Sequence, residues 1–248
     1  MDSTDSSDKD WKQVTLDIER DWRNPLCYYC GTPAVSKEHL PPDNLYACVQ
    51  RNLPMLTVPA CINHNNAYSQ LDDQFRSIIA SYCAPSSSAA MALLNSKVVR
   101  ANARNPKFTK AIYDEVETAD LWTLRGIYGG IRKIRFTFTP GERACLLNMY
   151  DRLTRSIYWQ SNGMPTTNLK IKLLDNQLPW DRDFIQQCMQ GFKLAPLSAV
   201  GHSDVFKLKV IGVGSKAEAL VIWTCFFDKL SMVSLAMSPE VVKHWRYL

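Results

Sequence analysis

Two short pairs of metal-binding residues constrain the fold of this chain more than any other feature. Cys27 and Cys30 are separated by two residues, and so are Cys61 and His64. Such a gap lets both side chains of a pair reach one ion, and Gly31 supplies a permissive turn after the first pair. Three thiolates and one imidazole suit a closed tetrahedral Zn²⁺ site, so we expect these four residues to hold a structural zinc. The alternative is that the cysteines are core residues and His64 is a solvated helix residue.

The remaining composition is that of a globular protein without a membrane span. The net charge is +5, and since the first ten residues hold four Asp and one Lys, the rest of the chain carries +8, which permits a polyanionic partner. We find no run of roughly 18 uncharged apolar residues, and the acidic, Ser-rich start does not resemble a signal peptide. We therefore expect a cytoplasmic protein with reduced cysteines. The five cysteines outside the two pairs are expected to be small buried hydrophobic residues: Cys48, Cys83, Cys145, Cys188 and Cys225.

The pattern of apolar residues predicts an α+β fold in four parts. Residues 1–24 read as a tail followed by a short helix over 10–21, because Trp11, Val14 and Ile18 recur at helical spacing. A loop-and-hairpin module that ends in a helix over 61–82 follows. Helices are expected over 89–104 and 141–160, with a strand over 131–139 between them, and strands over 169–174, 205–213, 219–227 and 232–237. The expected parts are thus 1–24, a zinc module over 25–84, a mainly helical region over 85–162, and an α/β region over 163–248.

Motifs within the zinc module resemble a family of nucleases. In order along the chain they are Cys27-Tyr28-Tyr29-Cys30, Glu38-His39-Leu40-Pro41-Pro42, the pair Cys61 and His64, and then Asn65-Asn66. This order is similar to that of the HNH endonucleases of the ββα-metal, treble-clef zinc type, and more closely to a bacterial subfamily with a Glu-His-x-Pro-Pro motif. The resemblance covers about residues 25–80. It implies a metal-dependent endonuclease that hydrolyses DNA phosphodiester bonds, and it leaves open a role in bacterial defence or in a mobile element.

The resemblance implies roles for individual residues. His39 is the expected general base that activates water, and Glu38 is an oxygen ligand of a catalytic divalent cation (Mg²⁺, Mn²⁺ or Ni²⁺) or a partner of that site. Asn65 stands where the family usually has its final His, and Asp72, two helical turns later, is a further candidate ligand. The middle Asn of the family is absent from its usual position. The alternatives are a structural His39, a helix-face or capping amide at Asn65, and an exposed or capping carboxylate at Asp72.

A basic stretch after the module is the candidate nucleic-acid surface. Lys97, Arg100 and Arg104 are spaced three and four residues apart, which places them along one face of an expected helix. The alternative is a merely solvated helix face. Two further readings of the whole chain remain: a catalytically degenerate, zinc-stabilised nucleic-acid-binding module, and a protein-interaction module. The region after residue 85 has no role assigned by its chemistry, and a homo-oligomer or a partner protein bound through the C-terminal region stays open.

Overall fold

An antiparallel sheet forms the centre of the structure, a computed structural model that describes residues 11–13, 25–100, 119–125, 132–173, 182–213 and 219–243. Within these residues the sheet has six strands in the order β1-β8-β9-β10-β6, with β7 paired to β8. The long central strands are rich in Val, Ile, Leu and Phe, as expected for strands that are buried on both faces. The strands of this sheet are β1 (Trp11–Gln13), β6 (Lys170–Leu173), β7 (Ser198–Ala199), β8 (Phe206–Val213), β9 (Ala219–Phe226) and β10 (Leu230–Met237).

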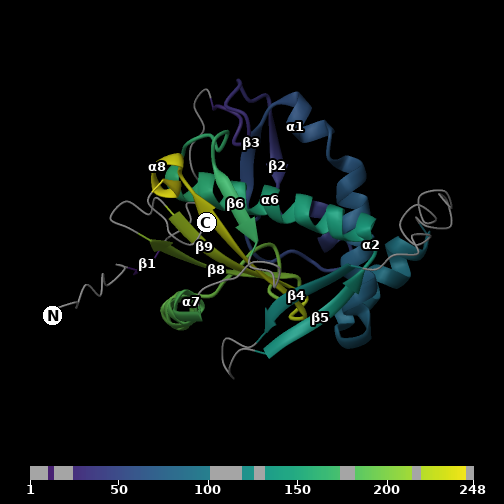
Figure 1. Ribbon diagram of the computed structural model, residues 1–248. Helices are drawn as coiled ribbons and strands as arrows, with labels where there is room; N and C mark the ends of the chain where they lie inside the picture. The colour runs from purple at the N-terminus through teal and green to yellow at the C-terminus, as the bar shows by residue number, and fades with distance from the viewer. Residues whose placement is uncertain are drawn as a thin grey trace.

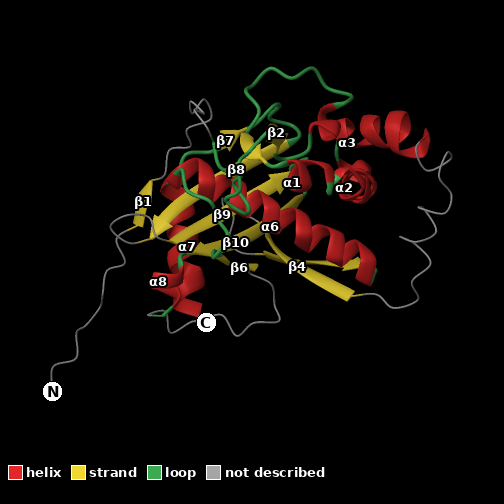
Figure 2. Ribbon diagram, turned by 90° about the horizontal axis from the view of Figure 1, so that it is seen from above, coloured by secondary structure: helices red, strands yellow, loops and turns green. Residues whose placement is uncertain are grey.

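Helices cover both faces of this sheet. The long helix α6 (Pro140–Asn162) runs across one face together with α2 (Ser69–Cys83), as Figures 1 and 2 show. On the other face, buried residues of α7 (Arg182–Leu194) pack with alternate residues of the same strands. The short helix α8 (Pro239–Val242) follows the last strand and packs on this second face as well.

Local sequence signals define both ends of α6. The Thr139 side chain accepts a hydrogen bond from the Glu142 backbone at 3.2 Å, and the Glu142 carboxylate accepts one from the Thr139 backbone at 2.9 Å. This reciprocal capping box, with Pro140 at the first helical position, fixes where the helix begins. Gly163 ends the helix in a left-handed conformation with φ of 72°, which a residue without a Cβ adopts most easily.

The N-terminal described segment folds as a turn, a hairpin and a helix. After the turn around Cys27–Gly31, β2 (Ser36–His39) pairs antiparallel with β3 (Thr57–Ala60), and α1 (Ile62–Asn66) lies against both strands. In Figure 1 the hairpin of this segment lies above α6. Its 3-10 helix η1 lies in the long hairpin loop, and α2 continues into η2, α3 and the π-helical η3. The bounds of these elements and of a second hairpin are η1 (Asp43–Tyr46), η2 (Ala84–Ser86), α3 (Ser88–Leu93), η3 (Leu94–Val98), β4 (Ala119–Arg125) and β5 (Arg132–Phe138).

One hydrophobic core joins the N-terminal segment to the rest of the structure. A single cluster of buried residues runs from Cys27 to Ala236. At its centre the ring of Phe226 on β9 lies 5.2 Å from that of Phe75 on α2 and 6.2 Å from that of Tyr150 on α6. Residues 25–84 therefore share their core with α6 and with the large sheet.

The structure supports most of the expected elements and corrects one. The helix predicted over 141–160 and the strands in the C-terminal region are present close to the expected bounds, the single helix predicted over 61–82 is divided into α1 (Ile62–Asn66) and α2 (Ser69–Cys83), and the mixed α+β class is confirmed. The helix expected over 10–21 is wrong at its start, because Trp11–Gln13 form the strand β1 against Val213–Ile211 of β8. The rest of that range lies outside the described residues. Three residues are too few for the spacing of apolar and polar side chains to distinguish an edge strand from one turn of a helix.

No helix in the described part of the chain combines the length and the apolar character that crossing a bilayer requires.

The shared core predicts that residues 25–84 cannot fold alone. A fragment of these residues, supplied with Zn²⁺, should show no cooperative thermal unfolding by circular dichroism, because Phe226 on β9 and the rest of the shared core are missing. The zinc-loaded full chain is the control. A fragment that binds one Zn²⁺ and unfolds in a single cooperative transition would show that the module is independent.

Candidate functional site

The two predicted ligand pairs meet at one point. The ligand atoms of Cys27, Cys30, Cys61 and His64 all lie within 4.8 Å of one another. The sulfurs of Cys30 and Cys61 are 3.8 Å apart, and His64 Nδ1 lies 3.7 Å from the Cys27 sulfur and 3.2 Å from that of Cys61. A tetrahedral Zn²⁺ with bonds of about 2.3 Å to sulfur holds its sulfur ligands about 3.8 Å apart. The four residues therefore fit a zinc ion, which His64 would ligate through Nδ1.

The turn that carries the first pair is held by backbone hydrogen bonds. The Cys27 amide donates to the Thr32 carbonyl at 2.7 Å, and the Gly31 amide donates to the Cys27 carbonyl at 2.9 Å. Gly31 has a φ of 75°, in the left-handed region where glycine is favoured. The Tyr28 amide donates to the Pro59 carbonyl of β3 at 2.8 Å, which ties the turn to the hairpin. The turn and the hairpin together place the two sulfurs of the first pair beside the helix α1.

The thiols of this cluster differ in their acidity. Burial raises the pKa of Cys27 to about 11. Burial also opposes ionisation of Cys61, but hydrogen bonds from the backbone and the side chain of His64 outweigh this effect and lower its pKa to about 6. Because a metal binds the thiolate, Cys61 loses its proton more readily than Cys27, whose proton a metal ion would have to displace.

Aromatic rings enclose the imidazole of His64. The ring of Tyr29 stacks on it with centroids 4.5 Å apart, and the ring of Tyr68 lies 6.3 Å away in a similar plane. Two guanidinium groups from α6 cap these rings: Arg155 lies 4.7 Å above Tyr29, and Arg152 lies 4.1 Å above Tyr68. Such cation–π contacts gain strength where water is excluded. The two cation–π contacts connect α6 to the aromatic rings beside His64.

The residues Glu38 and His39 point to opposite sides of β2. Glu38 is 5% exposed and faces inward, whereas His39 is exposed. The strand is regular at this point, with Glu38 opposite Val58 and His39 opposite Thr57. Alternation along a strand accounts for the two orientations. The hairpin thus presents an imidazole outward and a carboxylate inward from neighbouring positions.

Arg152 of α6 binds two of the predicted site residues. Its guanidinium donates through Nη2 to Oε1 of Glu38, and through Nη1 to Oδ1 of Asp72 at 2.7 Å. Arg152 is 1% exposed. Glu38 and Asp72 are therefore both paired with one buried cation, the guanidinium of Arg152.

Burial and pairing act against each other in this cluster. Burial raises the pKa of Glu38, while the charge of Arg152 works to lower it. The same two effects act on Asp72, whose pKa is also raised by burial. Burial favours loss of the Arg152 proton, but the charges of Glu38 and Asp72 outweigh it and raise the pKa of the guanidinium. Arg152 therefore stays charged.

The other predicted residues lie apart from Arg152. Asn65 is half-buried in α1, directly after the candidate ligand His64, and its backbone amide donates to the Cys61 carbonyl at 3.0 Å. Lys97 in η3 and Arg100, two residues after η3, are both exposed. Arg104 lies outside the described residues. The exposure of Lys97 and Arg100 fits a nucleic-acid surface and a solvated face equally well.

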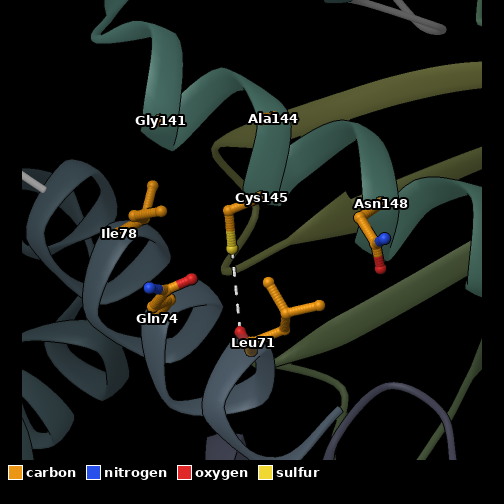
Figure 3. Close-up of a pocket in the computed structure, with 7 residues that line it drawn as sticks. All are labelled: Leu71, Gln74, Ile78, Gly141, Ala144, Cys145 and Asn148. Carbon is orange, nitrogen blue, oxygen red and sulfur yellow. Dashed lines mark hydrogen bonds between the residues drawn. The ribbon is translucent and has the colours of Figure 1, made fainter. Parts of the chain in front are cut away.

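The five remaining cysteines are free thiols, and four of them are buried: Cys83, Cys145, Cys188 and Cys225. Cys48 is half-buried. Cys145 lines a cavity of 310 Å³ between α2 and the start of α6, and its thiol donates to the Leu71 carbonyl at 3.7 Å (Figure 3). The amide side chains of Gln74 and Asn148 also line this cavity, which is separate from the zinc cluster.

Sequence reasoning missed the contribution of α6. Asp151 accepts hydrogen bonds from the Tyr29 hydroxyl at 3.3 Å and from Arg155 at 2.9 Å, and Arg152 joins the two acidic residues described above. The available signal was a charged residue within the apolar stripe that contains Met149 and Leu153. An arginine on a buried helical face needs an anionic partner, which local spacing does not identify.

Comparisons of the chain with protein-family models, with curated proteins and with solved structures found no match.

The cluster predicts about one tightly bound Zn²⁺ per chain, measured by elemental analysis of the purified protein. X-ray absorption should find three sulfur ligands and one nitrogen ligand. Cys30→Ser should lose the metal and the folded zinc module, since a structural Zn²⁺ contributes on the order of 10 kcal/mol. Cys48→Ser, outside the cluster, is the matched control and should keep the metal. A protein without zinc, or a zinc-loaded Cys30→Ser variant, would contradict the assignment.

Proposed function

We propose that this protein is a metal-dependent endonuclease of the HNH type that hydrolyses the phosphodiester bonds of DNA. One arrangement carries the proposal: an exposed imidazole, His39, follows a buried carboxylate, Glu38, on a hairpin that a metal cluster fixes against α1. These residues follow one another along the chain in the order in which they resemble the HNH endonucleases.

The proposed chemistry assigns the proton transfer to His39. A neutral imidazole near pH 7 accepts a proton from water as the water attacks phosphorus. His39 is exposed, so a nucleic-acid backbone can approach it from solvent. A bound divalent cation supplies charge stabilisation to the phosphate and to the departing 3′ oxygen.

The residues that would hold this cation are Glu38 and Asn65. Oε1 of Glu38 accepts from Arg152, and the hydroxyl of Tyr28 interacts with the same carboxylate, so a cation would have to share Glu38 with both groups. Carboxylate and amide oxygens are ligands that Mg²⁺ and Mn²⁺ accept. In this proposal Asp72 is not a ligand of the cation; it accepts a hydrogen bond from Arg152, which also binds Glu38.

A second candidate function is a zinc-stabilised nucleic-acid-binding module without catalysis. Arg152 supports it, because the guanidinium already balances part of the negative charge that would attract a cation. The inward orientation of Glu38, away from the exposed His39, supports it as well.

Cleavage of plasmid DNA separates the two candidates. With Mg²⁺, Mn²⁺ or Ni²⁺, the full chain should nick the plasmid, and His39→Ala should reduce the rate by about 10²- to 10⁴-fold, the usual contribution of a general base. His202→Ala is the matched control, because His202 is a histidine outside the site whose ring accepts from the Asp204 amide at 3.1 Å. Equal nicking by all three proteins, or by none, would contradict the nuclease. Single-stranded DNA and RNA substrates test the choice of polymer.

The exposed basic residues of the α3 region predict salt-dependent binding. Lys97→Glu/Arg100→Glu should weaken DNA binding for every sequence, and each lost phosphate contact should lower the slope of log affinity against log salt by about 0.9. Binding is measured by fluorescence anisotropy at several salt concentrations, and zinc content should not change. Lys193→Glu/Lys243→Glu changes the charge equally at two other exposed positions and is the control. Unchanged affinity and slope in the first variant would mean that this face is only solvated.

A further inference from the structure

The segment that follows α6 is bound to the backbone between the first two zinc ligands. The Tyr28 carbonyl accepts hydrogen bonds from the amide and from the hydroxyl of Thr166, each at 2.8 Å. The hydroxyl of Thr167 donates to the Tyr29 carbonyl at 3.4 Å. Tyr28 and Tyr29 are the two residues between the cysteines of the first pair. The turn that carries these cysteines is therefore held by residues from a distant part of the chain.

Arg155 of α6 holds this segment in place. Its guanidinium donates through Nη1 to the Thr166 carbonyl, through Nη2 to the Leu169 carbonyl at 3.4 Å, and through Nε to Asp151 at 2.9 Å. A planar guanidinium donates along fixed directions, whereas a lysine ammonium is a point charge that does not impose this geometry. The arrangement of these three acceptors thus depends on an arginine at this position.

The same guanidinium reaches the imidazole of His64 through one aromatic ring. The Cζ atom of Arg155 lies 4.7 Å from the centre of the Tyr29 ring, and that ring stacks on the imidazole with centroids 4.5 Å apart and 22° between the planes. The Tyr29 hydroxyl donates to Asp151 at 3.3 Å, and Asp151 is the ion-pair partner of Arg155. One ion pair therefore holds the ring of Tyr29 at its face and at its hydroxyl.

Stacking takes the role that a hydrogen bond has in most zinc sites. A histidine that binds a metal usually donates from its second ring nitrogen to a protein group, and this bond fixes the plane of the ring. Among the described residues, the hydrogen-bond partners of the His64 ring are the sulfurs of Cys27 and Cys61, both through Nδ1. We propose that Arg155 is a positioning residue for the zinc site, which acts through Tyr29 to fix the plane of the His64 imidazole and so directs Nδ1 at the ion. The inference concerns zinc binding and does not depend on the proposed nuclease.

Zinc affinity of the full chain is the first test. Arg155→Lys keeps the charge but loses the fork, so Zn²⁺, measured by competition with a chromophoric chelator, should bind about 10- to 100-fold more weakly, the usual effect of losing a group that orients a metal ligand. Arg76→Lys is the matched control, because the side chains of Arg76 and Arg155 are both 12% exposed and each pairs with an aspartate of its own helix. The zinc affinity of this control should equal that of the unmodified chain.

Cobalt separates positioning of the imidazole from a general loss of stability. Co²⁺ binds the same nitrogen and sulfur ligands as Zn²⁺, and its visible d–d bands depend on the geometry of those ligands. At saturating Co²⁺ the bands of Arg155→Lys should differ from those of the unmodified chain, because the imidazole is no longer held in its plane. A variant that is only less stable gives the unmodified spectrum once the site is full, and Arg76→Lys should do so.

Two substitutions at Tyr29 test the route of the effect. Tyr29→Leu removes the ring between Arg155 and His64 and should weaken Zn²⁺ binding, and in that background Arg155→Lys should cost less affinity than it does in the unmodified chain. Tyr29→Phe keeps the ring and should keep most of the affinity. Circular dichroism of the zinc-loaded chains shows whether each variant folds. If Arg155→Lys does not fold, the comparison of Tyr29→Leu with Tyr29→Phe still decides whether the ring positions the ligand.

Four results would overturn the inference. They are a chain that binds no zinc, unchanged zinc affinity in Arg155→Lys, an unchanged spectrum of that variant at saturating Co²⁺, and a Tyr29→Leu variant that binds Zn²⁺ as tightly as Tyr29→Phe. Cleavage of nucleic acid enters none of these measurements. The inference therefore stands if zinc binding depends on Arg155 through Tyr29, even where the chain cleaves no nucleic acid and the nuclease fails.

Discussion

The geometry of the N-terminal segment depends on the meeting of four ligand atoms from two distant pairs. Since Cys27 and Cys61 must lie at one point, the 30 residues between the pairs are closed into a loop whose ends are fixed. Closing such a loop costs conformational entropy, which the burial of apolar residues such as Leu40, Leu56 and Val58 in the shared core offsets. A metal ion bound by the four residues would contribute further free energy and would hold the ends of the loop that contains β2 and β3. Alternation along β2 turns Glu38 and His39 to opposite faces, and the register decides that Glu38 is the one that faces inward.

Helix α6 turns this segment into part of a larger unit. Its apolar residues cover one face of the large sheet, while Arg152, Arg155 and Gln160 contact the zinc module through ion pairs, ring contacts and a hydrogen bond to the Thr57 carbonyl. Buried ion pairs contribute little net stability, but removing one partner leaves an uncompensated charge that costs about 3–5 kcal/mol. The polar contacts of α6 therefore determine how the module docks more than how stable the fold is.

Features set by neighbouring residues were predictable from the sequence, and features set by distant ones were not. The zinc ligands follow from residue type and spacing, and the ends of α6 follow from Thr139, Glu142 and Gly163. The C-terminal strands follow from runs of Val, Ile and Phe. The strand at Trp11–Gln13 did not, because a three-residue edge strand depends on the partner β8. The pairing of Arg152 with Glu38 and Asp72 did not either, since no local pattern identifies the partner of a buried charge.

The attachment of the first turn to the segment after α6 has a consequence for the order of events during synthesis. Thr166 binds the carbonyl of Tyr28 through both its amide and its hydroxyl, each at 2.8 Å, although it lies 138 residues later in the chain. Because translation proceeds from the N-terminus, all four ligands leave the ribosome well before Thr166 does. A zinc ion that binds as soon as the four ligands are available would therefore bind before Thr166 is in place. The first turn gains its two hydrogen bonds to Thr166 only after most of the polypeptide has been made.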